Sequence, residues 1–345
     1  MAATRVGIVG GGVAGCSLAR TLSLLSKGSG TPAIKTTLFE MGRGLGGRTA
    51  TRRSSDSKLE GLAINHGAPA FDALSKEFKN MISEMEATGH VAPWKDMITG
   101  SFDANSGKLT MPTSSPTMFY RGAPAMSSLC EGLINGLEDE QFKCRFRTMV
   151  KDFKFSDKTK AGTAKISAST IGWQLSTFSA YIYFYTGDKG LSATLDEIGQ
   201  LRGDPVFVVM QDVLIYAFAE SILNFRLLRR THGRGGTAEA MGARSDSKDE
   251  KSVIGTLLSS FEKVCSSIGV EAPKGRACYG PALHRWGAAF PANIPSPTSS
   301  KPFRIHAQAR LIFAGDFLAI PGGRIETSYL SGAGAAEDLL AYYNS

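Results

Sequence analysis

Three glycines near the start of the sequence have the spacing of a phosphate-binding loop. Gly10, Gly12 and Gly15 form a Gly-x-Gly-x-x-Gly pattern between a short apolar run and a segment with apolar residues at helical spacing. Such a loop presents the free backbone N–H groups of a helix start to an anion. The pattern predicts a dinucleotide site, and the alternative is a tight turn that binds no nucleotide. The predicted phosphate loop consists of Gly10, Gly11, Gly12, Val13, Ala14 and Gly15.

An acidic residue and a second glycine-rich segment follow the next predicted strand, which covers residues 34–39. Glu40 closes this strand, where a carboxylate can accept hydrogen bonds from ribose hydroxyls. The segment after it contains two arginines, whose guanidinium groups supply the charge that phosphates need. A solvated basic loop is the alternative interpretation. The candidate binding residues here are Glu40, Arg43, Gly46, Gly47 and Arg48.

A third signal lies near the C-terminus. A predicted strand over residues 311–314 ends in Gly315 and Asp316, and a predicted helix over 326–342 follows Arg324 and Ile325. The Asp316 carboxylate can accept a hydrogen bond from a ligand hydroxyl, although a buried capping aspartate would be the usual structural role. The start of the helix carries partial positive charge, which stabilises negative charge on a group bound there.

The composition is typical of a globular enzyme. With 42% hydrophobic and 20% charged residues and 39 glycines among 345, the chain is neither disordered, collagen-like nor a coiled coil. Five scattered cysteines and five histidines without metal-ligand spacing predict no disulfide framework and no metal site. Residues 1–60 hold nine Lys and Arg against three acids, a charge that suits an anionic cofactor or, less well, a nucleic acid.

Targeting signals are not evident in the sequence. The first predicted strand begins by Val6, too early for a secretory or transit peptide, which predicts a cytoplasmic protein, or a plastid one if a presequence has been removed. The longest apolar stretch, residues 206–225, contains Gln211, Asp212 and Glu220 and is therefore a poor membrane span. We expect no membrane span and no nucleic-acid partner, and the oligomeric state is open.

These motifs together resemble the renalase-like and amine-oxidase-like family of FAD-dependent oxidoreductases, in particular its plant and algal branch. Residues 65–71, which include His66, Gly67 and Ala68, are similar to an Asp-x-Gly-Ala segment of that family. Other similar segments are residues 5–64, 120–126, 284–291 and 311–340, whereas residues 176–252 carry no motif of the family.

The resemblance implies the fold class and the cofactor. We expect an α/β chain, with an FAD-binding Rossmann-type domain of the two-dinucleotide-binding kind and a mixed-sheet domain that caps the substrate. The FAD-binding domain is expected over residues 1–70, 118–177 and 300–345, and the capping domain over residues 71–117 and 178–299, with a flexible loop at 231–252. No cysteine lies beyond Cys278, so the FAD is expected to be non-covalent.

The resemblance also implies a reaction, but it leaves the catalytic residues open. The implied activity is hydride transfer to flavin N5 from a small amine or a reduced nicotinamide-like substrate, with reoxidation by O2 or another acceptor. Trp286 could be a pocket wall or a core residue, and His284 and His66 could polarise substrate or flavin or be structural. Alternatives are an FAD-binding partner or assembly subunit without turnover, and a nicotinamide-dependent reductase.

Overall fold

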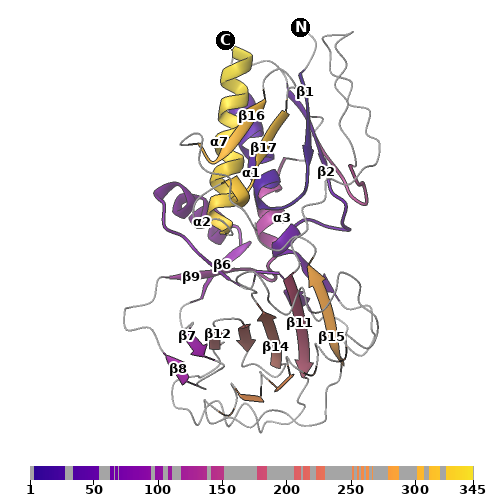
Figure 1. Cartoon of the computed structure of the whole chain (residues 1–345). Helices are drawn as coiled ribbons and strands as arrows, with labels where there is room; N and C mark the ends of the chain where they lie inside the picture. Colours follow the sequence, from indigo (N-terminus) through magenta and orange to yellow (C-terminus); the bar gives the residue numbers. More distant parts are fainter. Residues whose placement is uncertain are drawn as a thin grey trace. The chain divides into compact units, whose positions relative to one another are not determined.

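The computed structural model describes most of the two chain ends and the strands between them (Figure 1). The described residues are 4–27, 34–53, 63–65, 67–68, 70–94, 98–103, 108–110, 118–137, 141–150, 177–184, 206–210, 213–217, 223–229, 279–286, 301–306, 311–318 and 324–344, and isolated helical residues between 251 and 266. Between 98 and 110 and between 177 and 286, the strands are described by their backbone alone. The loop predicted at 231–252 lies outside this set apart from Lys251.

The chain divides into two compact units. Unit 1 comprises Met1–Pro93, Phe119–Trp173 and Phe290–Ser345, and unit 2 comprises Trp94–Met118 and Gln174–Ala289. Residues 71–93, which we assigned above to the capping domain, therefore cluster with unit 1. Among the described residues, no helix is both long and apolar enough to cross a membrane.

Unit 1 begins with a Rossmann-type βαβ arrangement. β1 (Thr4–Val9), α1 (Val13–Ser26) and β2 (Ile34–Phe39) follow one another, and β2 lies between β1 and β10 (Phe142–Arg145) in a parallel sheet. Alternation along β2 buries Ile34, Thr36 and Leu38 on one face. The sheet therefore brings the carboxyl ends of β1 and β2 to the same edge, where the phosphate loop and Glu40 begin.

Two helices from opposite ends of the chain pack closely in unit 1. α7 (Ile325–Asn344) lies along α1 (Figure 1), and a Cβ at Gly332 would overlap the carbonyl oxygen of Ala14. The buried Ser17 hydroxyl of α1 donates to the carbonyl oxygen of Tyr329 at 2.7 Å. β16 (Phe303–His306) and β17 (Leu311–Ala314) form an antiparallel pair beside α7. The C-terminal helix is thus fixed against the helix that starts at the phosphate loop.

The remaining elements complete the core of unit 1. α2 (Lys76–Ala87) starts at the N-cap Ser75, whose hydroxyl accepts the N–H of Phe78, and it buries Phe78, Met81, Ile82 and Met85 at helical spacing. The other elements are η1 (Gly47–Thr49), β3 (Thr51–Arg53), β4 (Ala63–Asn65), β5 (Phe71–Asp72), β6 (Val91–Trp94), β9 (Phe119–Gly122), α3 (Ser128–Ile134) and η4 (Asp316–Leu318).

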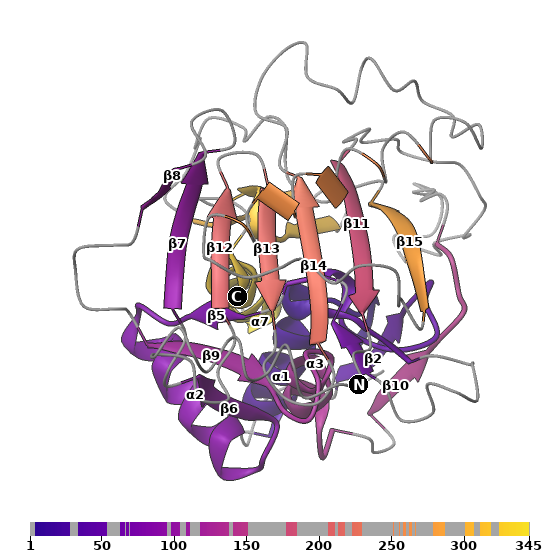
Figure 2. The ribbon, with the colours of Figure 1, turned by 90° about the horizontal axis from the view of Figure 1, so that it is seen from below.

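Unit 2 is built on one mixed sheet (Figure 2). Its strand order is β15-β11-β14-β13-β12-β7-β8, and every neighbouring pair is antiparallel except β12 and β7, which are parallel. The strands are β7 (Ile98–Asp103), β8 (Lys108–Thr110), β11 (Thr177–Phe184), β12 (Val206–Met210), β13 (Val213–Ala217), β14 (Leu223–Arg229) and β15 (Tyr279–Trp286). The mixed sheet predicted for the second domain is therefore present.

Candidate functional site

The glycines of the first loop have different structural reasons to be glycine. Gly10 has a φ of +102°, which side chains rarely adopt, and a Cβ at Gly15 would overlap the carbonyl oxygen of Gly10. A Cβ at Gly12 would lie 4.0 Å from Gly46 O and from Gly47 Cα, an ordinary contact distance. The fold itself thus requires Gly10 and Gly15, whereas a ligand lying against the backbone would be a reason for Gly12.

The start of α1 is electrostatically suited to an anion. Among the described residues, no side chain caps α1 at its N-cap Gly12, and its first turn contains no acidic residue. The N–H groups of Val13 and Ala14 belong to this first turn, which α-helical hydrogen bonding leaves without acceptors. Together with the helix dipole, these groups are of the kind that bind phosphate at helix starts.

Glu40 lies directly against the phosphate loop. Its Oε2 accepts the N–H of Gly11 at 2.7 Å, and its Oε1 accepts the N–H of Gly42 at 2.5 Å. These two bonds fix the carboxylate at the carboxyl end of β2. Each oxygen keeps a further lone pair, so the group has acceptor capacity left for a hydroxyl.

The second glycine loop docks on the first. The N–H of Gly46 donates to Gly11 O at 2.8 Å, and Gly12 and Gly46 form a parallel bridge. Gly46 and Gly47 have φ values of +127° and +53°, which suit glycine. The two predicted loops therefore form one backbone surface, and Arg43 lies exposed in the segment that leads to it. We call Gly10–Gly15 and Gly46–Arg48 together the cradle.

Arg48 and Asp316 bind each other at the edge of the cradle. Arg48 Nη1 donates to Asp316 Oδ2 at 2.7 Å, and Nη2 donates to Oδ1. The Asp316 side chain is only 3% exposed, whereas that of Arg48 is 39% exposed. From the sequence, we predicted that Arg48 supplies positive charge to phosphates and that Asp316 accepts a hydrogen bond from a ligand hydroxyl. The structure adds a shared one, because this bidentate pair fastens the second loop to the end of β17.

Residues 67 and 68 join the same cluster. The N–H of Ala68 donates to Arg48 O at 2.7 Å, and a Cβ at Gly67 would overlap that oxygen. The preceding strand is anchored by Asn65, whose Oδ1 accepts the Thr51 hydroxyl at 2.8 Å and the N–H of Met126 at 3.0 Å. His66 lies outside the described residues.

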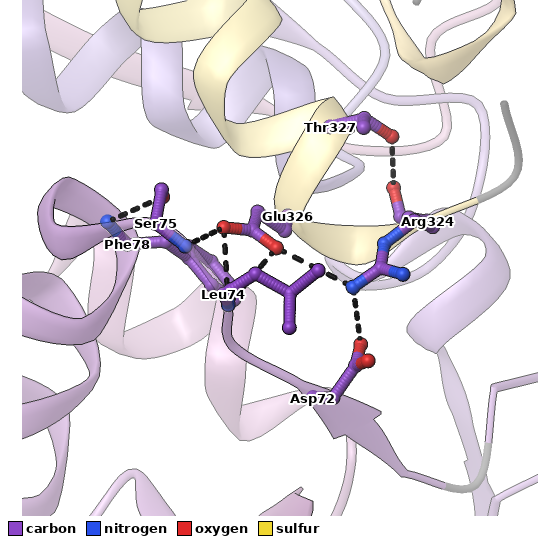
Figure 3. Close-up of polar contacts among 7 residues, drawn as sticks. All are labelled: Asp72, Leu74, Ser75, Phe78, Arg324, Glu326 and Thr327. Carbon is purple, nitrogen blue, oxygen red and sulfur yellow. Dashed lines mark hydrogen bonds and ion pairs between the residues drawn. The ribbon is translucent and has the colours of Figure 1, made fainter. Parts of the chain in front are cut away.

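The start of α7 is clamped to the segment between β5 and α2 (Figure 3). Arg324 Nη2 donates to Asp72 Oδ1 at 2.7 Å. Glu326, which is 5% exposed, accepts the N–H of Ser75 at 2.6 Å and that of Leu74 at 3.2 Å. We call Asp72, Arg324 and Glu326 the clamp. Ile325, the first residue of α7, lies between Arg324 and Glu326 in the sequence.

Hydrogen bonding determines the protonation of Glu326. Burial raises the pKa of this carboxyl, but hydrogen bonds from the Ser75 hydroxyl and from the Ser75 and Leu74 N–H groups, with the charge of Arg324, lower the pKa below its ordinary value. Glu326 is therefore ionised at neutral pH. Glu326 is not among the residues predicted from the sequence, although an acid in the first turn of a helix, two positions after an arginine, is a usable signal.

A further segment missed from the sequence lies beside Glu40. β10 ends at Arg145, and in the residues that follow it the N–H of Thr148 donates to Glu40 O at 2.9 Å and the N–H of Arg147 donates to Gly42 O at 2.9 Å. These two adjoining segments carry the exposed side chains of Met41 and Phe146. Exposed apolar side chains in segments that adjoin a carboxylate could contact a flat, uncharged group.

Two of the three predicted pocket residues belong to unit 2. His284 and Trp286 are on β15 of unit 2, opposite Ser179 and Thr177 of β11 in the strand register. In the described part of the chain, no group of three or more His, Cys, Asp or Glu residues could hold a metal ion.

Known proteins share the first domain and the fold. Residues 8–85 match the NAD(P)-binding Rossmann-like domain family. A candidate protoporphyrinogen oxidase from Exiguobacterium sp. 255-15 superposes with a TM-score of 0.61 at 15% identity, covering 99% of this chain and 100% of that one. An oxidoreductase from Methanosarcina mazei gives 0.61 at 10% identity, covering 97% and 100%.

A third solved structure contains a flavin. CtdE in complex with FAD and a substrate superposes with a TM-score of 0.53 at 11% identity, covering 98% of this chain and 81% of that one. The predicted fold class is confirmed: this is an α/β protein with a Rossmann-like nucleotide-binding domain and a second, mixed-sheet unit, in a fold that known oxidoreductases adopt. Likeness at these identities establishes the fold and leaves the function to be argued from the site.

Proposed function

We propose that this chain is an FAD-dependent oxidoreductase that binds FAD non-covalently in the cradle. The docking of Gly46 on Gly11 and Gly12 carries this proposal. A nicotinamide-binding Rossmann domain needs only the first loop, whereas a second glycine and arginine loop against it extends the phosphate-binding surface toward a larger dinucleotide. None of the described residues gives Gly12 a steric reason to be glycine, which supports a bound pyrophosphate.

The residues present fit the parts of FAD in turn. The start of α1 would hold the pyrophosphate, Glu40 the adenosine ribose, and the surface around Met41 and Phe146 the adenine. The flavin side is assigned by resemblance to Gly67, Ala68, Asp316, Arg324 and Ile325. Arg48 donates one hydrogen bond to each oxygen of Asp316. A ribityl hydroxyl would therefore donate to a lone pair that Arg48 does not use.

The proposed reaction follows from the cofactor and the family resemblance. Bound FAD supplies a hydride acceptor at N5 and is reoxidised by O2 or another acceptor. The substrate is a small amine or a reduced nicotinamide-like compound, as in renalase-like and amine-oxidase-like enzymes. Unit 2 would cap the substrate, with Trp286, His284 and His66 as pocket candidates. The FAD seen in CtdE supports a flavin in this fold.

Absorbance spectroscopy tests the proposal in two steps. Purified protein should show flavin bands and release FAD on heating. Anaerobic addition of amines, NADH or NADPH should then bleach the bands, and admission of O2 should restore them. A coloured protein that no substrate bleaches would favour the alternative, an FAD-binding protein without turnover. A colourless protein that cannot be reconstituted with FAD would contradict both.

A further inference from the structure

The turn at the end of β17 is held by one buried side chain of α7. The N–H of Gly315 donates to the hydroxyl oxygen of Ser331 at 2.7 Å, and this hydroxyl donates its single hydrogen to Pro302 O at 2.6 Å. Ser331 is fully buried and Gly315 is buried, so water does not compete for the bond between them. Replacing the Ser331 hydroxyl would therefore leave the buried N–H of Gly315 without this acceptor.

The backbone conformation of Gly315 depends on hydrogen bonds of this kind. Its φ is +154°, which side chains rarely adopt, and a Cβ at this position would overlap the ring of Phe317. Because a glycine has many backbone conformations of similar energy, its hydrogen bonds must select this one. The Ser331 hydroxyl fixes the N–H of Gly315, and Gly315 O accepts the N–H of Leu318 at 3.1 Å. Both polar groups of Gly315 are thus bound.

The fixed turn determines where the side chain of Asp316 starts. Asp316 follows Gly315 directly, and Arg48 binds both oxygens of its buried carboxylate. The residue is therefore held from two sides, through its backbone by α7 and through its carboxylate by the second loop. The lone pairs that Arg48 does not use keep one direction before any ligand binds, which lowers the entropy cost of binding a hydroxyl there.

We propose that Ser331 is a positioning residue for the ribityl chain of FAD, which acts through the turn at Gly315 and aligns the Asp316 carboxylate with a ribityl hydroxyl. This inference rests on the proposed function, because it assumes that FAD occupies the cradle with its ribityl chain at Asp316. Without the Ser331 hydroxyl, we expect the turn to shift as the N–H of Gly315 finds another acceptor. The flavin half of FAD should then be bound less tightly, whereas the adenosine half should not be affected.

Titration of apoprotein with FAD and with ADP tests this role. ADP carries the adenosine and the pyrophosphate of FAD but no ribityl chain, so its affinity reports the cradle alone. Ser331→Ala removes the hydroxyl, and Ser17→Ala is the matched control, because Ser17 is also fully buried and donates to Tyr329 O at 2.7 Å. For S331A we expect about tenfold weaker binding of FAD and a change within about twofold for ADP. In S17A, the two affinities should change by the same factor.

A spectroscopic probe separates positioning from loss of stability. The visible circular dichroism of bound FAD depends on the surroundings of the flavin, so it should change in S331A and stay unchanged in S17A. If S331A does not fold, Ser331→Cys takes its place, because a thiol is a weaker donor and acceptor than a hydroxyl. Equal losses of FAD and ADP affinity, or unchanged affinities with an unchanged spectrum, would overturn the inference alone. Failure of the wild-type protein to bind FAD would overturn the proposed function and the inference with it.

Discussion

Two buried carboxylates tie the C-terminal part of unit 1 to its N-terminal part, and each has a different kind of partner. Asp316 is bound by the guanidinium of Arg48 through two hydrogen bonds. Glu326 is bound by the Ser75 hydroxyl and by the backbone N–H groups of Leu74 and Ser75 just before α2. The first carboxylate is thus neutralised by a single side-chain charge, and the second by backbone dipoles with a more distant arginine.

The difference predicts how each contact can be broken. A single substitution of Arg48 leaves the Asp316 charge buried without its partner, which is the costly way to break an ion pair. No side-chain substitution removes the backbone donors of Glu326, so that contact depends on the carboxylate itself and hence on pH. The cradle should therefore be sensitive to mutation, and the clamp to acid.

The largest expected effect is that of Arg48→Met. It should lower the free energy of unfolding by about 2 to 3 kcal/mol, because Asp316 remains buried without the guanidinium. Denaturation with urea measures the loss. Arg43→Met, at an exposed arginine of the same segment, is the matched control and should change stability by less than about 0.5 kcal/mol.

The double variant R48M/D316N sharpens this result. It removes the unpaired charge and should recover part of the stability that R48M loses. A double variant that is less stable than R48M by the full cost of D316N would mean that the two side chains act independently.

A smaller effect is expected for Glu326→Gln, and it should depend on pH. The pKa of Glu326 is lower in the folded protein than in the unfolded chain, where it is about 4.3. The ionised group therefore stabilises the fold above that value, and this contribution disappears as the pH falls through the folded-state pKa. E326Q should be less stable than wild type by about 1 kcal/mol at pH 7, with the difference shrinking below about pH 4.

Thermal unfolding across this pH range measures the difference between the two proteins. Glu131→Gln, at an exposed glutamate of α3, controls for a change of net charge. A difference between E326Q and wild type that stays constant from pH 7 to pH 3 would contradict the role given to the ionised carboxylate.

The smallest effect is expected for Asp72→Asn in the clamp. Asp72 and Arg324 are each 27% exposed, so water screens their ion pair. The variant should lose about 0.5 kcal/mol of stability, and less at high salt. A loss of stability as large as that of R48M would mean that solvent exposure does not explain why the two ion pairs differ in strength.

The residues of the cradle could be predicted from the sequence, but the contacts that hold its two loops together could not. The glycine spacing, Glu40 and the strands around them could be found because a left-handed φ and close packing leave a mark on residue type, as at Gly10 and Gly15. The contact between Gly46 and Gly11 uses backbone atoms alone, so no side chain signals it.

Contacts between distant parts of the sequence were not predictable in this way. The backbone N–H groups that bind Glu326 lie more than 250 positions earlier, and Arg48 and Asp316 pair because β17 ends beside the second loop. The parallel pairing of β12 with β7 in unit 2 likewise depends on the connections between strands, which hydrophobic patterns do not encode.

A titration of apoprotein with FAD, performed on wild type and on Gly12→Ala, tests the central claim most directly. Among the described residues, no atom lies closer than 4.0 Å to a methyl group at Gly12, so the variant should fold, with at most the small loss of stability that alanine causes in place of glycine at a helix N-cap. We expect one FAD per wild-type chain and about a hundredfold weaker binding in G12A, because the methyl group occupies the surface that the pyrophosphate needs. Equal affinity in the two proteins, or no binding of FAD by wild type, would contradict the assignment of the cradle to a dinucleotide.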